Sequence, residues 1–145
     1  MAEFTSAALQ TVATNQNVLF TETPYCCCTN GNGNIIHREG SGLITLRGNT
    51  CGQCYAKYRV TFNSNIAVPD GGTAGEISIA IAINGEALQT SVATVTPTAT
   101  EAFFNVSTFA EIDVPKGCCY QISVENISDQ DIDVQNANIL VQRIG

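Results

Sequence analysis

The sequence predicts an all-β protein, built as an antiparallel β-sandwich or jelly roll. Apolar and polar or small residues alternate along several short runs, most strictly along 77–83, where isoleucine occupies every second position. Stretches rich in Gly, Asn and Pro separate these runs, and no window keeps a helical period. Many short strands joined by turns are typical of two sheets that cover each other.

The expected strands follow one another along the chain. Residues 18–20 are expected to form a short first strand, and 35–47 a strand or a bent pair. Asn84 and Gly85 should end the isoleucine-rich strand in a tight turn. The remaining strands are expected over 55–63, 76–84, 91–96, 102–114, 120–126 and 132–143.

The closing strand, 132–143, is expected at the centre of a sheet. Ile139 and Val141 point to one face and Leu140 to the other. An edge strand of a solvated sheet would avoid apolar groups on both faces. We therefore expect a second sheet or a neighbouring subunit to cover each side.

Two phenylalanines stand on the polar face of the run 102–114. Phe104, Val106 and Ile112 share its apolar face, whereas Phe103 and Phe109 lie among Asn, Ser, Glu and Asp. They either meet another subunit or are covered by loops of their own subunit. Phe103 and Phe109 are therefore the candidate trimer-interface residues.

Length and charge restrict the class of protein. A chain of 145 residues fits one domain, with 17–145 as the jelly roll and 1–16 as an N-terminal arm that docks on a partner or is loosely held. With a net charge of −7 and no basic run, neither nucleic acid nor a membrane surface is an expected partner. Since neither a signal peptide nor a membrane-spanning run is recognisable, we expect synthesis in a cytoplasm.

The seven cysteines fall in three loop clusters. Cys51 and Cys54 have the spacing of half a zinc knuckle or of a redox motif, although the redox motif needs a helix that the sequence does not predict. Because successive strands alternate in direction, their loop and the loop of the last cluster should share one end of the molecule. We favour disulfides between loops, with zinc at Cys51, Cys54, Cys118 and Cys119 or free thiols as alternatives. The clusters are Cys26, Cys27 and Cys28; Cys51 and Cys54; and Cys118 and Cys119.

Other polar residues offer little chemistry. His37 is the only histidine, so a hydrolase would have a single imidazole to use as a base, and we expect no enzyme. Asp129, Asp131 and Asp133 are spaced as at the start of a calcium loop, but the Gly and the distal Glu of such a loop are absent, so a charged turn is favoured. A sugar-binding platform would require Tyr25, Tyr55, Tyr58 or Tyr120 to be exposed together.

The order of these patterns resembles the globular heads of the tumour-necrosis-factor and complement-like family. The resemblance rests on 17–20, 40–46, 77–88 (ISIAIAINGEAL), 103–114, 120–126 and 138–144. It is closest to bacterial and phage versions, such as the C-terminal head of collagen-like spore-surface glycoproteins, and to cysteine-rich virion proteins of prophages in gut Firmicutes. This chain departs from the spore-surface proteins in lacking a Gly-X-Y stalk. The resemblance implies a ten-stranded jelly roll that forms a compact trimer for display, adhesion or stabilisation.

These observations favour a structural protein of a virion. We expect a homotrimeric capsid decoration or head-fibre protein, attached to the capsid or another virion protein through the arm and requiring no cofactor. Assembly in a reducing bacterial cytoplasm followed by release would explain cysteines without an export signal. The alternative is a receptor- or glycan-binding tip of a phage tail fibre, or a bacterial surface-display head.

Overall fold

The computed structural model describes residues 2–21, 35–37, 40–49, 52 and 54–144. These residues form strands and one short 3-10 helix, η2, over Gln89–Ser91. Among them, no helix is long and apolar enough to cross a membrane. The strands are β1 (Ala2–Ser6), β2 (Gln10–Val12), β3 (Ile35–His37), β4 (Ile44–Arg47), β5 (Tyr55–Ala67), β6 (Ile77–Ile83), β7 (Glu86–Ala87), β8 (Ala93–Val95), β9 (Phe104–Pro115), β10 (Cys119–Asn126) and β11 (Ile132–Arg143).

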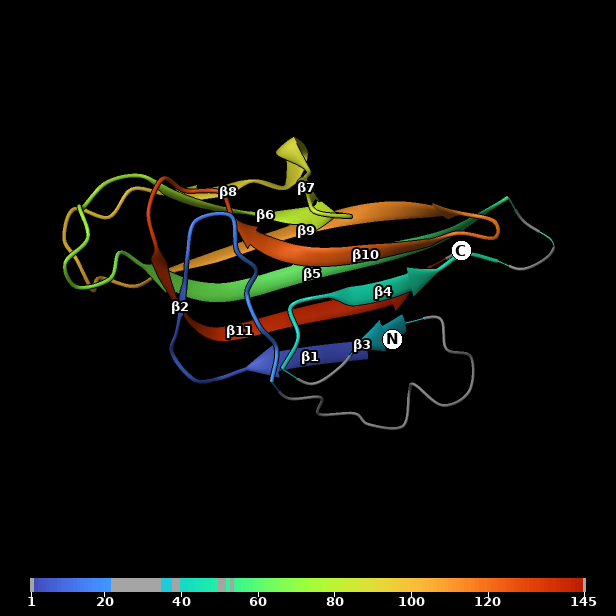
Figure 1. Ribbon diagram of the computed structural model, residues 1–145, viewed down its shortest axis with the longest axis horizontal. Coiled ribbons are helices and arrows are strands. Elements are labelled where there is room, and N and C mark those ends of the chain that lie inside the picture. The colour runs from blue at the N-terminus through green and yellow to red at the C-terminus, as the bar shows by residue number, and fades with distance from the viewer. Residues whose placement is uncertain (1, 22–34, 38–39, 50–51, 53, 145) are drawn as a thin grey trace.

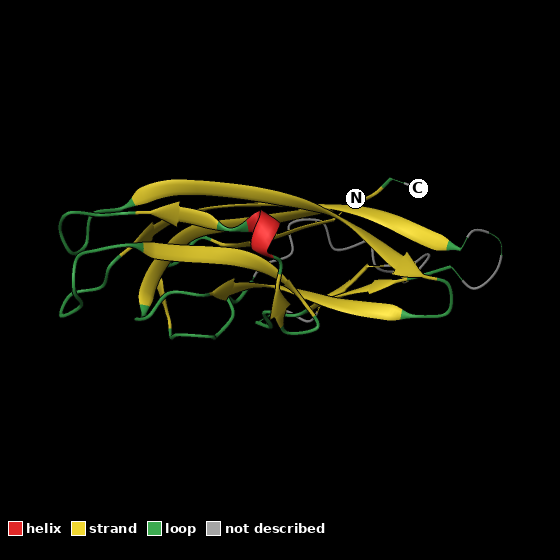
Figure 2. Cartoon of the chain, turned by 90° about the horizontal axis from the view of Figure 1, so that it is seen from above, coloured by secondary structure: helices red, strands yellow, loops and turns green. Residues whose placement is uncertain are grey.

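The strands build two antiparallel sheets that pack face to face (Figures 1 and 2). Sheet A has the order β1-β11-β5-β9, with β2 also paired to β11. Sheet B has the order β3-β4-β10-β6-β7, with β8 also paired to β6. The predicted all-β antiparallel sandwich is confirmed.

The N-terminal segment belongs to the sandwich. β1 pairs with β11 so that Phe4 stands opposite Ile139, and Phe4 is only 1% exposed. β2 pairs with the other half of β11, where Val12 stands opposite Ile132. The expectation of an arm over 1–16 that adds little to the jelly roll is therefore wrong, because both strands pair with β11 and bury Phe4 and Val12 in the core.

The expected strand over 18–20 is also corrected. This segment makes only isolated bridges, from Asn17 to Glu125 and from Phe20 to Ser41. Val18 and Phe20 are nevertheless fully buried. The backbone of the segment bonds to β10, where the N–H of Val18 donates to the carbonyl of Val124 at 2.8 Å, and its apolar side chains enter the core.

The closing strand is central, as predicted. β11 has β1 and β2 on one side and β5 on the other. Ile139 and Val141 point into the core and are buried, whereas Leu140 points away from sheet B and is half-buried. One face of this central strand is thus covered by sheet B, and the other is not covered by the described residues.

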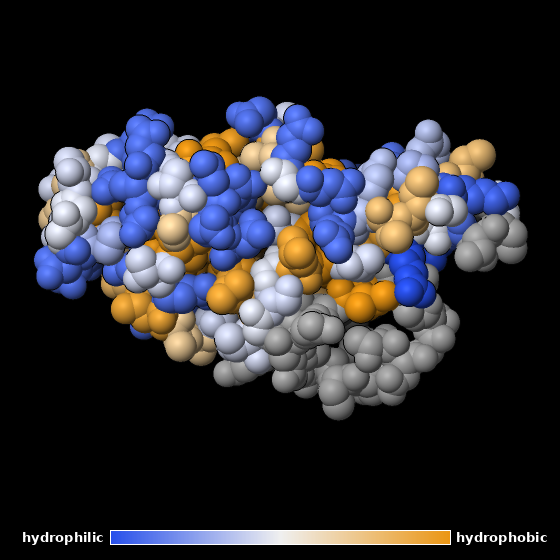
Figure 3. Space-filling view, viewed as in Figure 1, coloured by the Kyte–Doolittle hydropathy of each residue, from blue (hydrophilic) through white to orange (hydrophobic). Residues whose placement is uncertain are grey.

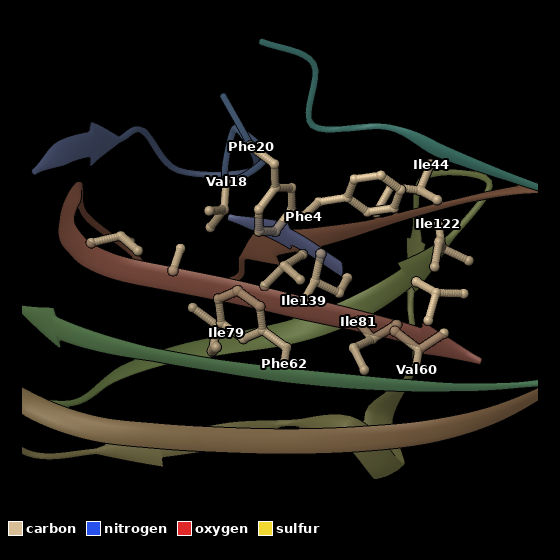
Figure 4. Close-up of a cluster of buried hydrophobic side chains, with 14 of the residues drawn as sticks. Phe4, Val18, Phe20, Ile44, Val60, Phe62, Ile79, Ile81, Ile122 and Ile139 are labelled. Carbon is tan, nitrogen blue, oxygen red and sulfur yellow. The ribbon is translucent and has the colours of Figure 1, made fainter. Parts of the chain in front are cut away.

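The core lies between the sheets (Figure 4). The rings of Phe20 and Phe62 meet edge to face, with centroids 6.2 Å apart at 76°, a favoured aromatic geometry. Every residue of β6 except Ile83 is buried, including the small Ser78, Ala80 and Ala82 on the face away from sheet A. Burial of these apolar groups is the main favourable term of folding.

The predicted turns are in place. β3 and β4 form the bent pair expected over 35–47. Asn84 and Gly85 both have positive φ, 52° and 86°, in the two-residue connection between β6 and β7. That conformation matches the right-handed twist of the flanking strands, which explains the choice of Asn-Gly here.

Candidate functional site

Two cysteine-bearing loops meet at one end of the sandwich, at the right in Figure 1. The N–H of Gly48 donates to the carbonyl of Cys118, and the N–H of Lys116 donates to the carbonyl of Cys54, both at 2.8 Å. A third bond of 2.8 Å joins the N–H of Gly117 to the carbonyl of Asn49. The prediction that these loops share an end is confirmed, because their backbones are hydrogen-bonded to each other.

Glycine permits this close approach. A Cβ atom on Gly48 would lie 2.1 Å from the carbonyl oxygen of Pro115, a distance that no side chain could occupy. Gly117 has a φ of +77° in the turn that Cys118 closes by donating its N–H to Pro115 at 3.0 Å. These two glycines permit the chain path that brings the two loops together.

The structure places three of the predicted cysteines. Cys54, Cys118 and Cys119 are exposed and carry free thiols. Cys26, Cys27, Cys28 and Cys51 lie outside the described residues. Within the described part of the chain, no three His, Cys, Asp or Glu side chains are placed to hold a metal ion. This end therefore offers accessible thiols on two connected loops, which is a setting for disulfide exchange.

A second candidate surface is the face of sheet A that points away from sheet B. Register places Leu140 of β11 opposite Thr61 of β5, and Thr61 opposite Phe109 of β9. Leu140 is half-buried and Phe109 is 65% exposed. These three residues, named here the sheet A row, lie side by side across β11, β5 and β9, and Glu3 of β1 stands opposite Leu140 at the other end of the row. Alternation along the sequence singled out Phe109 and Leu140 separately, whereas only the register shows that they lie in the same row.

The rest of this face is polar and locally paired. Asn105 donates its side-chain amide to the side-chain oxygens of Asn63 (3.1 Å) and Asn65 (3.2 Å). Arg59 forms an ion pair with Glu111 at 3.0 Å, and Lys57 approaches Asp113 at 4.0 Å. Exposed pairs of this kind stabilise a fold weakly. On the β9 side of the sheet A row these pairs match each acid with a cation, whereas Glu3 of β1 adds an acid on the other side.

Phe103 and Phe109 are not covered by loops of the described chain. Phe103 is 40% exposed just before β9 begins. Phe104, expected on the apolar face with Val106 and Ile112, is itself 44% exposed because it lies at the very start of the strand, opposite Ile66. Contact of the two phenylalanines with another subunit stays a prediction.

The aspartates considered for calcium binding and the histidine considered as a base do not form one site among the described residues. Asp129 and Asp131 line a shallow hollow with Asp70, whereas Asp133 is buried and accepts a hydrogen bond from Thr11 at 2.8 Å. Hydrophilic residues gather on several parts of the face shown in Figure 3, with apolar residues between them. His37 takes a place in β3 opposite Ile44.

The tyrosines do not form the platform that sugar binding would need. Tyr58 is fully buried, Tyr55 is exposed at the cysteine-bearing end, and Tyr120 is half-buried on β10. Tyr25 lies outside the described residues. The three described tyrosines are therefore not exposed together.

Comparison with known proteins identifies the fold. No family model and no curated protein matches the chain. Its structure is similar to "Eiger TNF from S. frugiperda", with a TM-score of 0.71 and 12% identity over 99% of this chain and 91% of that chain. It is also similar to the globular domain of zebrafish complement 1qA protein, with a TM-score of 0.57 and 13% identity over 96% of this chain and 94% of that chain. At these identities the likeness shows the fold alone, which is the jelly roll of tumour-necrosis-factor and complement-like heads.

Proposed function

We propose that this chain is a structural virion protein, a capsid decoration or head-fibre protein that forms a homotrimeric jelly roll on a phage particle. The observation that carries the proposal is the outward face of sheet A. Its central strands β11 and β5 present Leu140 and Thr61 of the sheet A row, the outer strand β9 presents Phe109, and no layer of the described residues covers them. Apolar groups at the centre of such a face favour contact with another copy.

The shape and charge of this face suit self-association. The row next to the sheet A row consists of Thr5, Asn138, Asn63 and Ser107, whose side chains are short and uncharged. The nearby cations and acids compensate each other in the two ion pairs. Like-charge repulsion between identical copies around a symmetry axis is therefore small over β5 and β9, with Glu3 of the outer strand β1 as the acid of the sheet A row. Phe103, near the start of β9, would extend the apolar part of the contact.

Attachment to the particle is proposed through the N-terminal segment. Because β1 and β2 are bonded into sheet A, the segment cannot act as a released arm without breaking the sandwich. The connection between them carries Leu9, which is 55% exposed. Leu9 is the apolar group that a capsid or other virion protein would contact, and the trimer would then stand on the virion surface after assembly in the bacterial cytoplasm.

A glycan-binding tip has less support, since the described tyrosines are not exposed together. The proposed role is structural and not enzymatic.

Light scattering at micromolar concentration tests the trimer. We expect a mass three times the 15.3 kDa of the chain, and a monomeric wild type would overturn the proposal. The Phe109→Asp variant should release monomers, because a charge at an apolar contact costs about 2–5 kcal/mol. Leu43→Asp is the matched control, since Leu43 is an exposed apolar residue outside sheet A.

Particle binding is tested separately with Leu9→Asp. This variant should remain folded and trimeric but no longer bind the particle. Undiminished binding would place the anchor elsewhere.

A further inference from the structure

β9 is the outer strand of sheet A. Its inner edge pairs with β5 from Pro115, opposite Tyr55, to Phe104, opposite Ile66. No strand of the described residues pairs with its outer edge. The start of that edge is partly covered by η2, since the Thr108 hydroxyl donates to the carbonyl of Ser91 at 2.6 Å. The part that stays open is 109–113.

The register shows which backbone groups point outward. Ile144 donates its N–H to the carbonyl of Lys57 at 2.8 Å, so Lys57 directs its backbone polar groups toward β11. Alternate residues of a strand face opposite neighbours, so Tyr58 faces β9 and bonds with its partner Ile112. Residues 109, 111 and 113 of β9 therefore direct their N–H and C=O groups to the open edge.

A groove runs along this edge. It has a volume of about 520 Å³, and β9 forms one wall over 109–113. The apolar part of the opposite wall consists of Ile83 of β6, Tyr120 of β10, and Leu88, which precedes η2; each is half-buried. An exposed strand edge beside an apolar groove is the geometry that accepts an added strand.

The side chains of β9 specify what the added strand would carry. Across sheet A, Lys57 stands opposite Asp113 and Arg59 opposite Glu111. A cation placed beyond each acid would continue this alternation of charge, because opposite charges on neighbouring strands attract. The acid Glu86 lines the adjoining groove, and no Lys or Arg lines either groove.

We propose that the open edge of β9 binds an extended peptide segment of a partner protein as an additional antiparallel strand of sheet A, with apolar residues alternating with Lys or Arg. The apolar side chains enter the groove against Ile83, Leu88 and Tyr120. The cations lie on the other face, beside Glu111 and Asp113. This inference goes beyond the proposed display role and does not depend on it.

The test uses a synthetic peptide with capped ends, in which isoleucine alternates with lysine, and the full-length chain in a calorimetric titration. Opposite Glu111 and Asp113, the lysine N–H groups would donate to β9, whereas the isoleucine N–H groups would point to solvent. N-methylation of those two lysines should weaken binding about tenfold or more. N-methylation of the isoleucines is the matched control and should change the affinity of the peptide less than about threefold.

Two variants locate the site on the protein. Glu111→Ala removes the carboxylate and keeps the N–H, so it should weaken binding by a small factor. Glu111→Pro also removes the N–H, which a strand tolerates where that group faces outward, and it should weaken binding further. Circular dichroism confirms that each variant is folded.

Three results would overturn the proposal: no binding at millimolar peptide, equal weakening by the two sets of N-methyl groups, or equal affinity for a peptide with glutamate in place of lysine.

Discussion

The hydroxyl of Tyr58 donates a hydrogen bond of 2.5 Å to the backbone carbonyl of Arg47. Tyr58 belongs to β5 in sheet A and Arg47 to β4 in sheet B, so this bond joins the two sheets near the cysteine-bearing end. Tyr58 is fully buried, and its ring also fills the core. One side chain thus combines packing with a polar link between the layers.

Replacing Tyr58 by Phe should keep the packing and remove that link. We expect the free energy of unfolding to fall by about 1 kcal/mol, the net contribution of one such bond. Urea denaturation measures the change. Tyr55→Phe is the matched control, because Tyr55 is exposed and should contribute nothing measurable. An unchanged stability for Tyr58→Phe would mean that water replaces the bond.

The same tyrosine predicts a dependence on pH. Burial raises the pKa of Tyr58, an effect partly offset by the positive charge of Arg143. Above the ordinary pKa of about 10 the unfolded chain loses this proton before the folded chain does, so the stability falls as pH rises. The free energy of unfolding of the wild type should therefore exceed that of Tyr58→Phe by less as the pH rises from about 9 to about 11. A constant difference over this range would contradict the raised pKa.

The buried amide of Asn126 holds three segments together. It donates to the carbonyls of Val12 at 2.9 Å and Gln130 at 3.0 Å, and accepts from the N–H of Ser128 at 2.9 Å. Asn126→Ala should lower the free energy of unfolding by about 3 kcal/mol, because buried polar partners lose their bonds. Thermal denaturation in a calorimeter measures this fall in stability. A loss below about 0.5 kcal/mol would show that these groups find other partners.

The N-terminal strand should matter for stability. Phe4→Ala is expected to cost about 3–5 kcal/mol, the usual range for removing a buried aromatic ring. Leu9→Ser, five residues along and exposed, should leave the stability unchanged. If both substitutions changed the stability equally and only slightly, the N-terminal segment would not contribute to the stability of the fold.

Ser64 is a position where a substitution should increase the stability of the protein. Its hydroxyl is buried on β5 without a hydrogen-bond partner in the described part of the chain. Ser64→Ala should raise the free energy of unfolding by about 1 kcal/mol, since an unsatisfied buried group is removed. Ser78→Ala serves as the comparison, because the Ser78 hydroxyl bonds with that of Thr94 at 2.9 Å and its loss should destabilise. A destabilised Ser64→Ala would reveal a partner for this hydroxyl.

Oxidation should connect the two cysteine-bearing loops. With glutathione disulfide as oxidant, two protein thiols lose their hydrogens to form a bond, and the oxidant becomes two molecules of glutathione. We expect a disulfide from the loop of Cys54 to Cys118 or Cys119, detected by non-reducing peptide mapping. The Cys118→Ser, Cys119→Ser double variant should lose that cross-link. Thiols that stay fully titratable under oxidant would contradict the expectation.

Several features of the fold followed from local patterns. The alternation along 77–83 and 132–143 predicted β6 and β11, and Asn84-Gly85 predicted the turn between β6 and β7. Strand direction alone predicted that the loops of Cys54 and Cys118 share an end. These predictions succeeded because pleat, turn conformation and chain reversal depend on neighbouring residues.

The all-β class and the order of the main strands were predictable from the amino-acid sequence alone. Only the tertiary structure decided that β1 and β2 pair with β11, that Leu140, Thr61 and Phe109 form one row, and that β9 keeps an open edge. The physical reason is distance along the chain. Thr11 bonds to Asp133 across 122 positions, and such a pairing depends on register between remote strands, which local alternation does not specify.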